Sequence, residues 1–367
     1  MSTFGGMGTE LWLLILCMPI IVYGAMMVTF RYRFREFPNG SDDHPKPKVS
    51  VIIPFRNEHE NLLDLFTSLE NLSIEIPDEV IWVDDGSTDD GATVLEALFL
   101  NSRIPHKLIR IEGSGKKPAL DAGIRASLGD WILTTDADCK VPTTWVNDLV
   151  LSIRSAPERS VWCGPVTFKK GSLWQRMQSL DFLALVASSR SMINMGFPVM
   201  ANGSNLAFRR MTYLDLSQAL LSRSHPGGDD TFLVQEVALT LGSNRVGYVP
   251  TQNTVETTAP STLKSWWDQR IRWASKTPGY SYYPAKAVAL VVFLANFIPW
   301  IMVFLDPWFA VWVMGIKVIN EAFFLQLPMR YYRRNDLWWM ILPQGVFNYF
   351  YIPIVGLFSL LAPVRWK

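Results

Sequence analysis

Three clusters of acidic residues carry the side chains best suited to chemistry. They are Glu58, Asp84 with Asp85, and Asp136 with Asp138, and each follows a short apolar run. Two carboxylates at positions i and i+2 of a turn can face one hard cation, whose other ligands would be water and phosphate oxygens. A single Asp-x-Asp is common by chance, but this one directly follows a predicted strand over 131–135 that begins with Trp-Ile-Leu. The pattern therefore favours a cation site at Asp136 and Asp138.

A further acidic pair, Asp229 and Asp230, follows two glycines and precedes an apolar helix expected over 231–241. An aspartate at the N-cap of this helix would explain the pair without any catalytic role, because its side chain can accept a hydrogen bond from a free backbone N–H. Both interpretations, helix cap and reactive carboxylate, are open at this stage.

Basic residues in two segments are suited to phosphate groups. Segment 113–117 reads Gly-Ser-Gly-Lys-Lys and lacks the spacing of a phosphate-binding loop, but Lys116 can reach a diphosphate as a point charge. Segment 262–275 has the pattern of an amphipathic helix. One stripe of this helix comprises Trp266, Gln269, Arg270 and Trp273. Anchoring at a membrane interface explains the tryptophans, whereas the dense arginines suit a phosphate partner.

The elements that must position these groups alternate between strands and helices. Apolar runs of strand length lie at 49–54, 80–83, 107–111 and 131–135, and helical patterns lie at 59–72, 91–101 and 118–128. Such alternation predicts an α/β fold with a mostly parallel sheet covered by helices on both faces. Ligands in these sheets bind outside the carboxyl ends of the strands. The three acidic clusters are therefore expected to converge at one edge of one sheet.

Composition narrows the class of protein. The 367 residues include 34 Lys and Arg against 33 Asp and Glu, and this near-neutral balance gives no support for binding to nucleic acid. Hydrophobic residues make up 49% of the chain, which excludes a disordered protein. The three cysteines are far apart and predict neither a disulfide framework nor a zinc site of the usual spacing.

The apolar residues gather at the two ends of the chain. An uncharged run over 11–30 is long enough to cross a bilayer, and it is followed by Arg31, Arg33 and Arg35. By the positive-inside rule, the residues after this anchor are cytoplasmic. Three further apolar runs lie at 287–305, 308–327 and 337–363, with arginines at 330, 333 and 334 before the last one. The same rule places these arginines in the cytoplasm.

The middle of these three runs is the least certain span. Lys317 and Glu321 are four residues apart, so they share a helix face and can pair in the interior of a helix bundle. An interfacial or re-entrant helix is the alternative for this segment. The prediction is therefore one N-terminal span and two or three C-terminal spans.

Several further motifs complete an ordered set over residues 49–273. The set comprises Val49-Ser50-Val51-Ile52-Ile53-Pro54 with Asn57-Glu58, Val83-Asp84-Asp85-Gly86-Ser87-Thr88-Asp89, Gly115-Lys116 with Ala119-Leu120 and Gly123, Asp136-Ala137-Asp138, Gly203-Ser204-Asn205, Asp229-Asp230 and Gln269-x-x-Arg272-Trp273. Together these motifs resemble the family 2 glycosyltransferases, specifically the membrane-bound branch with the hyaluronan, cellulose and chitin synthases and ceramide glucosyltransferase. The resemblance covers about three-fifths of the chain.

The resemblance implies a glycosyltransferase A fold and inverting transfer from a nucleotide sugar, usually a UDP-sugar, with Mg²⁺ or Mn²⁺. It assigns contacts with the nucleotide sugar to Pro54, Glu58, Asp84, Asp85, Lys116, Asp136, Gln269, Arg272 and Trp273. It assigns the cation to Asp138 and Asp136, with Asp138 favoured as the direct ligand. It assigns the acceptor site to Gly203, Asn205 and Trp273, and the general base to Asp230, with Asp229 as the alternative.

Departures from the family pattern limit what is carried over. Gly228-Asp229 stands where the family usually has Thr-Glu, and Asp121 stands where Asn is common. The gating segment of the cellulose synthases has no convincing counterpart, which argues against a cellulose-like polymerase.

These observations predict four regions of the chain. They are an N-terminal transmembrane anchor over 1–35, a cytoplasmic glycosyltransferase domain over 36–260, an amphipathic interface helix over 261–286 and C-terminal transmembrane helices over 287–367. The expected protein is a multi-pass enzyme of the membrane, with a bacterial inner membrane as the expected location, that transfers a sugar to a lipid or lipid-linked glycan. A processive polysaccharide synthase is the nearest alternative. An inactive membrane scaffold of a glycan-export complex is the alternative that is not an enzyme.

Overall fold

The computed structural model describes residues 4–35, 44–113, 115–223 and 227–361, with side chains from residue 15 onward. The chain divides into two compact units. One contains the described residues of 36–169 and 192–259, and the other contains those of 1–35, 170–191 and 260–363. Segment 170–191 thus groups with the terminal helices, although its sequence position placed it inside the predicted 36–260 domain.

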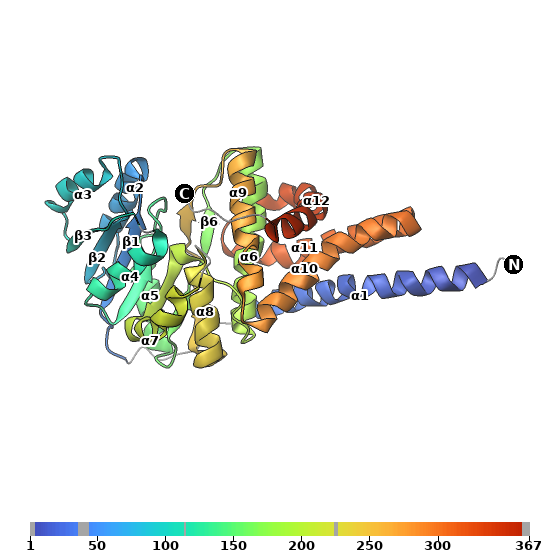
Figure 1. The fold of residues 1–367 in the computed structure, drawn as a ribbon, viewed down its shortest axis with the longest axis horizontal. Helices are drawn as coiled ribbons and strands as arrows, with labels where there is room; N and C mark the ends of the chain where they lie inside the picture. Colours follow the sequence, from blue (N-terminus) through green and yellow to red (C-terminus); the bar gives the residue numbers. More distant parts are fainter. Residues whose placement is uncertain (1–3, 36–43, 114, 224–226, 362–367) are drawn as a thin grey trace. The chain divides into compact units, whose positions relative to one another are not determined.

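The first unit is built on a seven-stranded sheet in the order β3-β2-β1-β4-β7-β5-β8. Its strands are β1 (Val49–Phe55), β2 (Glu79–Asp84), β3 (His106–Arg110), β4 (Trp131–Thr134), β5 (Val161–Cys163), β7 (Leu206–Arg209) and β8 (Val246–Tyr248). All neighbouring pairs are parallel except the two that involve β7. Figure 1 shows β1, β2 and β3 side by side. The predicted α/β fold with a mostly parallel sheet is confirmed.

The remaining elements of this unit surround the sheet. Its helices are α2 (His59–Glu70), α3 (Gly91–Phe99), α4 (Lys116–Ala126), α5 (Trp145–Ser155), α7 (Arg210–Leu221) and α8 (Asp229–Thr240), and a second, two-stranded sheet joins β6 (Val166–Phe168) to β9 (Val255–Thr257). The four predicted strands and the three predicted helices before residue 136 each begin and end within two residues of the observed elements. These segments are predictable because every residue of β1 and β4 is buried, as expected for central parallel strands.

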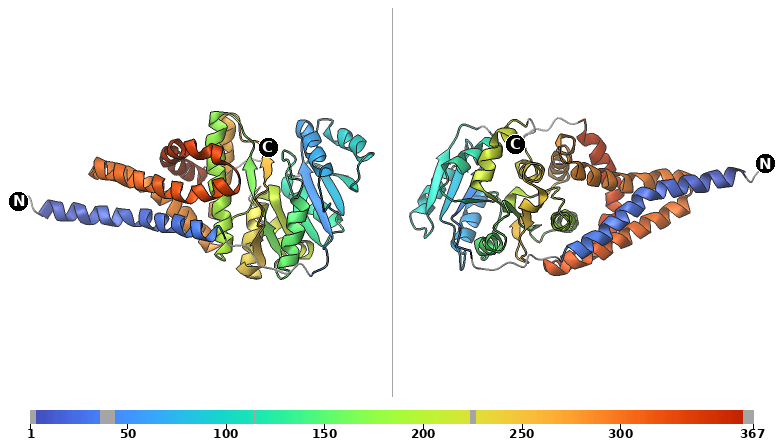
Figure 2. Two further views of the ribbon diagram at one scale, coloured as in Figure 1. Left: turned by 180° about the vertical axis from the view of Figure 1, so that it is seen from behind. Right: turned by 90° about the horizontal axis from the view of Figure 1, so that it is seen from below.

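The second unit consists of helices. They are α1 (Phe4–Arg33), α6 (Leu173–Asn194, up to residue 191), α9 (Leu263–Ala274), α10 (Tyr283–Leu305), α11 (Pro307–Tyr331), the 3₁₀ helix η4 (Asn335–Met340) and α12 (Ile341–Ser359). Among the described residues, four segments are long and apolar enough to cross a membrane, namely Ile15–Arg33, Tyr283–Leu305, Pro307–Tyr331 and Asn335–Ser359. Helices α1, α10 and α11 pack against one another, and Figures 1 and 2 show α1 beside α10.

Buried side chains hold the terminal helices together. Ile20 of α1 packs in a core cluster with residues of α10 and α11, including Met302 and Val313. The ammonium of Lys317 donates to Glu321 at 2.6 Å, and the hydroxyl of Tyr23 donates to the same carboxylate oxygen at 2.6 Å. The predicted pairing of Lys317 with Glu321 in the bundle interior is therefore observed, and a helix from the other end of the sequence completes it.

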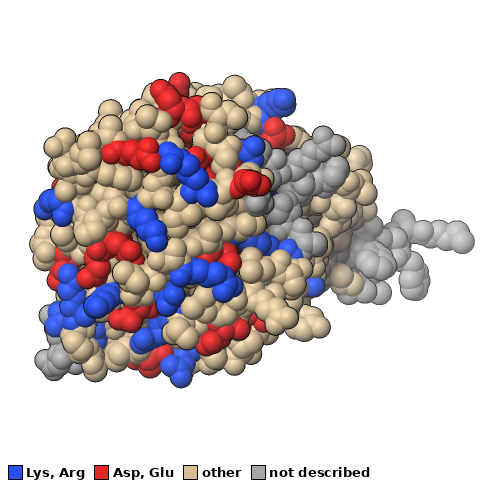
Figure 3. Space-filling view, turned by 60° about the vertical axis from the view of Figure 1, so that its left-hand side comes forward, with Lys and Arg blue, Asp and Glu red and all other residues tan. Residues whose placement is uncertain are grey.

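Charged side chains of both signs are distributed over the surface. On the face drawn in Figure 3, the Lys and Arg side chains of the described residues lie among Asp and Glu side chains. This mixture agrees with the formal net charge of +1.

The contact between α4 and the sheet gives a test of the fold. A Cβ atom at Gly123 would lie 2.6 Å from a methyl of Ile52 and 3.0 Å from a methyl of Val83. We expect Gly123→Ala to lower the free energy of unfolding by about 1–3 kcal/mol, because this overpacks the contact of α4 with β1 and β2. Thermal unfolding in detergent measures the loss. Gly315→Ala in α11 is the matched control, since no atom lies within 4 Å of its added Cβ; equal losses in both variants would contradict the prediction.

Candidate active site

The carboxyl ends of β1, β2 and β4 meet at one edge of the large sheet. The parallel register pairs Phe55 with Asp84 and Ile52 with Thr134, so the acidic turns that follow these strands are neighbours. Asp84 is 6% exposed and accepts a hydrogen bond from the backbone N–H of Ser87 at 2.8 Å. The predicted convergence of the three acidic clusters on one sheet edge is therefore observed.

The turn after β1 is held against the turn after β2. Asn57 has a φ of 55° and its side-chain oxygen accepts from the backbone N–H of Thr88 at 2.7 Å. Its own N–H donates to the hydroxyl of Ser87 at 3.0 Å. This arrangement places the predicted nucleotide residues Pro54 and Glu58 beside Asp84 and Asp85, because it joins the two turns that carry them.

The start of α4 connects two of the acidic clusters. The backbone N–H of Gly115, the N-cap residue with a φ of 97°, donates to both carboxylate oxygens of Asp85 at 3.0 and 2.9 Å. The next residue, Lys116, forms an ion pair with Asp136. Burial opposes the charged form of Lys116, but the charge of Asp136 and their hydrogen bond outweigh it and raise the pKa of the ammonium. Lys116 thus lies among the carboxylates as the sequence predicted.

Asp136 and Asp138 form the candidate cation site. The hydroxyl of Ser204 donates to Asp136 at 2.5 Å, and the hydroxyl of Thr257 donates to Asp138 at 3.0 Å. Burial, and then repulsion by Asp136, raise the pKa of the Asp138 carboxyl. A divalent cation fits this pair, since it would stabilise both carboxylates in the ionised form that oxygen ligation requires. Groups of three or more acidic, His or Cys side chains that could bind a metal are absent from the described residues, so the other ligands would come from water and substrate.

Asp229 and Asp230 lie in the first turn of α8 and have different partners. The N-cap of α8 is Gly228, with a φ of 93°, so neither aspartate occupies the N-cap position itself. The carboxylate of Asp230 accepts from the backbone N–H of Gly203 at 2.9 Å and from that of Thr231 at 2.7 Å. The carboxylate of Asp229 lies 3.5 Å from the ammonium of Lys117.

Gly203 and Asn205 belong to a 3₁₀ helix, η1 (Gly203–Asn205), that is anchored to the sheet. The hydroxyl of Thr134, the last residue of β4, donates to the carbonyl of Gly203 at 2.7 Å. Asn205 is 7% exposed, and its amide bonds the indole N–H of Trp145 and the carbonyl of Pro165, each at 3.0 Å. These partners favour a structural role for Asn205 over the predicted contact with the acceptor, whereas Gly203 lies against Asp230.

Three predicted site residues, Gln269, Arg272 and Trp273, lie on α9 in the unit of terminal helices. Thr262 caps this helix with a reciprocal hydrogen-bond pair to Ser265, which confirms the helix predicted over 262–275. The buried Oε1 atom of Gln269 has no hydrogen-bond partner within the part of the chain that the structure describes.

Helix α9 is fastened inside its own unit by Arg270. The guanidinium of Arg270 is 2.8 Å from Asp181 of α6 and lies over the ring of Trp273, while Tyr351 of α12 donates to the same carboxylate at 2.6 Å. Arg270, one of the two residues between Gln269 and Arg272, thus positions the motif that contains it, a role that the spacing alone did not indicate.

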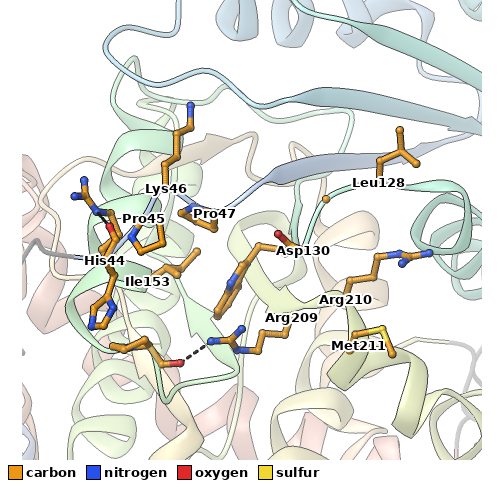
Figure 4. A pocket seen from close by; sticks show the side chains of 14 residues that line it. His44, Pro45, Lys46, Pro47, Leu128, Asp130, Ile153, Arg209, Arg210 and Met211 are labelled. Atoms are coloured by element: carbon orange, nitrogen blue, oxygen red, sulfur yellow. Dashed lines mark hydrogen bonds between the residues drawn. The ribbon is translucent and has the colours of Figure 1, made fainter.

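A cavity of about 470 Å³ lies at the opposite, amino-terminal edge of β1 and β4 (Figure 4). Its lining includes Lys46, Trp131, Arg154, Arg209 and Arg210. The arginines donate hydrogen bonds to backbone carbonyls. For example, Arg209 donates to the carbonyl of Pro157 at 2.5 Å, and Arg154 donates to that of His44 at 2.6 Å. These hydrogen bonds show that the arginines stabilise the fold. None of the predicted site residues lines this cavity.

Comparison with known proteins finds a family model that matches part of the chain. Residues 50–215 match the model of Glycosyl transferase family 2. A dolichol-phosphate mannosyltransferase of Pyrococcus furiosus is 35% identical over 115 residues, which are 31% of this chain and 32% of that protein. An N-acetylglucosaminyltransferase of Rhizobium meliloti is 28% identical over 246 residues, which are 64% of this chain and 57% of that protein. The chain therefore spans less than two-thirds of the length of either relative.

A solved structure shows the same fold over nearly the whole chain. It is a mannosyltransferase from Pyrobaculum calidifontis in complex with GDP-Man and Mn²⁺, and its TM-score is 0.54 at 17% sequence identity. The match covers 92% of this chain and 98% of that structure. The fold predicted from the family resemblance is confirmed.

The anchoring of α9 gives a test within the second unit. Asp181→Ala would leave the guanidinium of Arg270, which is 4% exposed, without its carboxylate. We expect a loss of about 3–5 kcal/mol in the free energy of unfolding, measured by thermal unfolding in detergent. Tyr351→Phe removes only the hydrogen bond to Asp181 and should cost less, about 1.5–3 kcal/mol. A wild-type melting temperature for Asp181→Ala would contradict this account of α9.

Proposed function

We propose that this chain, which carries a glycosyltransferase family 2 domain over residues 50–215, transfers a sugar from a nucleotide sugar to a hydroxyl group of a lipid or lipid-linked glycan. The proposal rests on the carboxylates around the start of α4. Asp85, Asp136 and Asp229 contact three consecutive residues there, namely Gly115, Lys116 and Lys117 in that order. Such a site can bind a nucleotide diphosphate, a cation and an acceptor at one sheet edge.

The proposed donor site is the edge formed by the turns after β1, β2 and β4. Pro54, Glu58, Asp84 and Asp85 would contact the nucleoside, and Lys116 would contact the diphosphate. The predicted donor is a UDP-sugar, and the GDP-Man bound by the mannosyltransferase from Pyrobaculum calidifontis makes GDP-mannose the natural competitor to test. The role that the family resemblance assigns to Gln269, Arg272 and Trp273 of α9 stays a prediction.

Asp136 and Asp138 would hold Mg²⁺ or Mn²⁺. Their carboxylates provide the hard oxygen ligands that both ions prefer, and the mannosyltransferase from Pyrobaculum calidifontis is complexed with Mn²⁺. When bound, the ion would neutralise the negative charge that develops on the leaving diphosphate.

Asp230 is the proposed general base. An acceptor hydroxyl has a high pKa, so it needs a base to take its proton as the new bond forms. Backbone N–H groups of Gly203 and Thr231 fix the orientation of the Asp230 carboxylate. Inversion then follows from attack of the acceptor on the face of the anomeric carbon opposite the diphosphate.

The membrane location is proposed from the four long apolar helices. Arginines follow or end α1 and α11, at 31, 33 and 35 and at 330, 333 and 334. The positive-inside rule therefore supports a multi-pass protein with its glycosyltransferase domain in the cytoplasm.

The product of the reaction tests the proposal. Purified protein in nanodiscs would be incubated with Mn²⁺, membrane lipid extract and radiolabelled UDP-glucose, UDP-N-acetylglucosamine or GDP-mannose. A single label on an organically extractable lipid is the expected result. A high-mass product would instead establish a processive polysaccharide synthase, and absence of both binding and turnover with every donor would overturn the proposal.

Removal of the proposed base should slow the chemical step. We expect Asp230→Asn to lower kcat by about 10²–10⁴-fold while nucleotide binding is retained. Asp215→Asn, an exposed carboxylate on α7, is the matched control. Wild-type turnover by Asp230→Asn would exclude this residue as the base, and unchanged cellular glycolipid in that variant would favour a scaffold.

Removal of the proposed metal ligand should weaken binding of the donor nucleotide. We expect Asp138→Ala to weaken Mn²⁺-dependent binding of UDP or GDP by more than about 10-fold, because one of the two carboxylates that would hold the ion is lost. Calorimetric titration with and without Mn²⁺ measures the effect, and Asp64→Ala on the exposed face of α2 is the control. If Mn²⁺ strengthens nucleotide binding equally in both variants, Asp138 is not a ligand.

A further inference from the structure

Lys117 has contacts that the sequence analysis did not anticipate. It is the second residue of α4, and its side chain is only 13% exposed. Its ammonium lies 3.5 Å from the carboxylate of Asp229 and donates to the carbonyls of Leu220 and Arg223 at 3.4 and 3.1 Å. These partners lie on both sides of the connection between α7 and α8, so one ammonium contacts both ends of that connection.

The two aspartates at the start of α8 have different partners. Asp229 is 15% exposed and faces Lys117, whereas Asp230 accepts from Gly203 beside the end of β4. Gly228 precedes them with a φ of 93°, a backbone conformation that lets the chain turn sharply into the helix. Two side-chain contacts hold the first turn of α8, that of Asp229 with Lys117 and that of Asp230 with Gly203.

We propose that Lys117 is a positioning residue, which holds Asp229 and the carboxyl end of α7 so that Asp230 points at the acceptor. This inference rests on the proposed function, since it takes Asp230 as the base. It also gives two adjacent lysines different roles. Lys116 pairs with Asp136 on the donor side, and Lys117 pairs with Asp229 on the side of the base.

A second contact, made by the guanidinium of Arg223, should keep the domain folded without Lys117. Arg223 pairs with Glu236 of α8 at 2.7 Å and lies over the ring of Phe232. This contact joins the segment just after α7 to α8 further along the helix. Loss of the Lys117 ammonium should therefore loosen the first turn of α8 rather than detach the helix.

The test compares Lys117→Met with Asp229→Asn, with the double variant and with Lys117→Arg. Assays use the radiolabelled UDP-glucose, UDP-N-acetylglucosamine and GDP-mannose panel with membrane lipid extract. We expect each single variant and the double variant to lower kcat by about 100-fold, the effect of a misplaced catalytic group. The donor KM should remain at the wild-type value, and Lys117→Arg should recover part of the activity because it retains the charge. Lys107→Met, an exposed lysine on β3, is the control.

Hydrogen exchange provides a readout that does not depend on turnover. We expect the backbone amides of the first turn of α8 to exchange faster in Lys117→Met, while those of α2 keep their wild-type rates.

Three results would overturn the inference. They are unchanged exchange in Lys117→Met, wild-type kcat in Lys117→Met, and full recovery of activity in the double variant. Full recovery would mean that charge balance alone is sufficient. If Lys117→Met is fully active while Asp230→Asn is inactive, only the role of Lys117 fails. If Asp230→Asn is fully active, the proposed base fails and the role of Lys117 fails with it.

Discussion

Repulsion between carboxylates is the constraint on which the candidate site depends. Two like charges 4 Å apart near a protein surface repel by about 4 kcal/mol, a large part of the stability of a typical domain. The fold meets this constraint with Gly115–Lys117, where a backbone N–H contacts Asp85, one ammonium contacts Asp136 and the next contacts Asp229. The start of α4 thereby determines the spacing of acidic groups that come from three separate parts of the chain.

The sheet determines why α4 can reach all three groups. Strands β1, β2 and β4 are adjacent and parallel, so their carboxyl ends lie together. Helix α4 approaches the sheet closely at Gly123, where a methyl group would clash with Ile52. The turn before α4 lies against Gly86, where an added Cβ would be 2.9 Å from the backbone of Gly113. Small residues at these contacts let the helix start lie directly over the acidic edge.

Much of this architecture was predictable because its signals are local. Buried parallel strands are continuous apolar runs in the sequence, and the acidic clusters are visible in the turns that follow these runs. Contacts between distant residues were not predictable in the same way. The pairing of Lys117 with Asp229 joins positions that no periodic pattern relates, and Lys117 beside a glycine-rich turn reads as an exposed basic residue. Asn205 matched a family motif, yet its bonds to Trp145 and Pro165 are visible only in the folded chain.

Charged groups are also paired in the unit of apolar helices, where an unpaired charge has a larger free-energy cost. An isolated charge away from water is costly, so such charges are found paired. Lys317 is 1% exposed and meets Glu321 on its own helix, while Tyr23 from α1 bonds the same carboxylate. Arg270 of α9 meets Asp181 of α6 in the same manner. A wrong register of α1 would separate Tyr23 from Glu321, and a wrong register of α9 would separate Arg270 from Asp181. These two contacts therefore favour one arrangement of α1 with α11 and one of α6 with α9, where apolar packing alone would tolerate several.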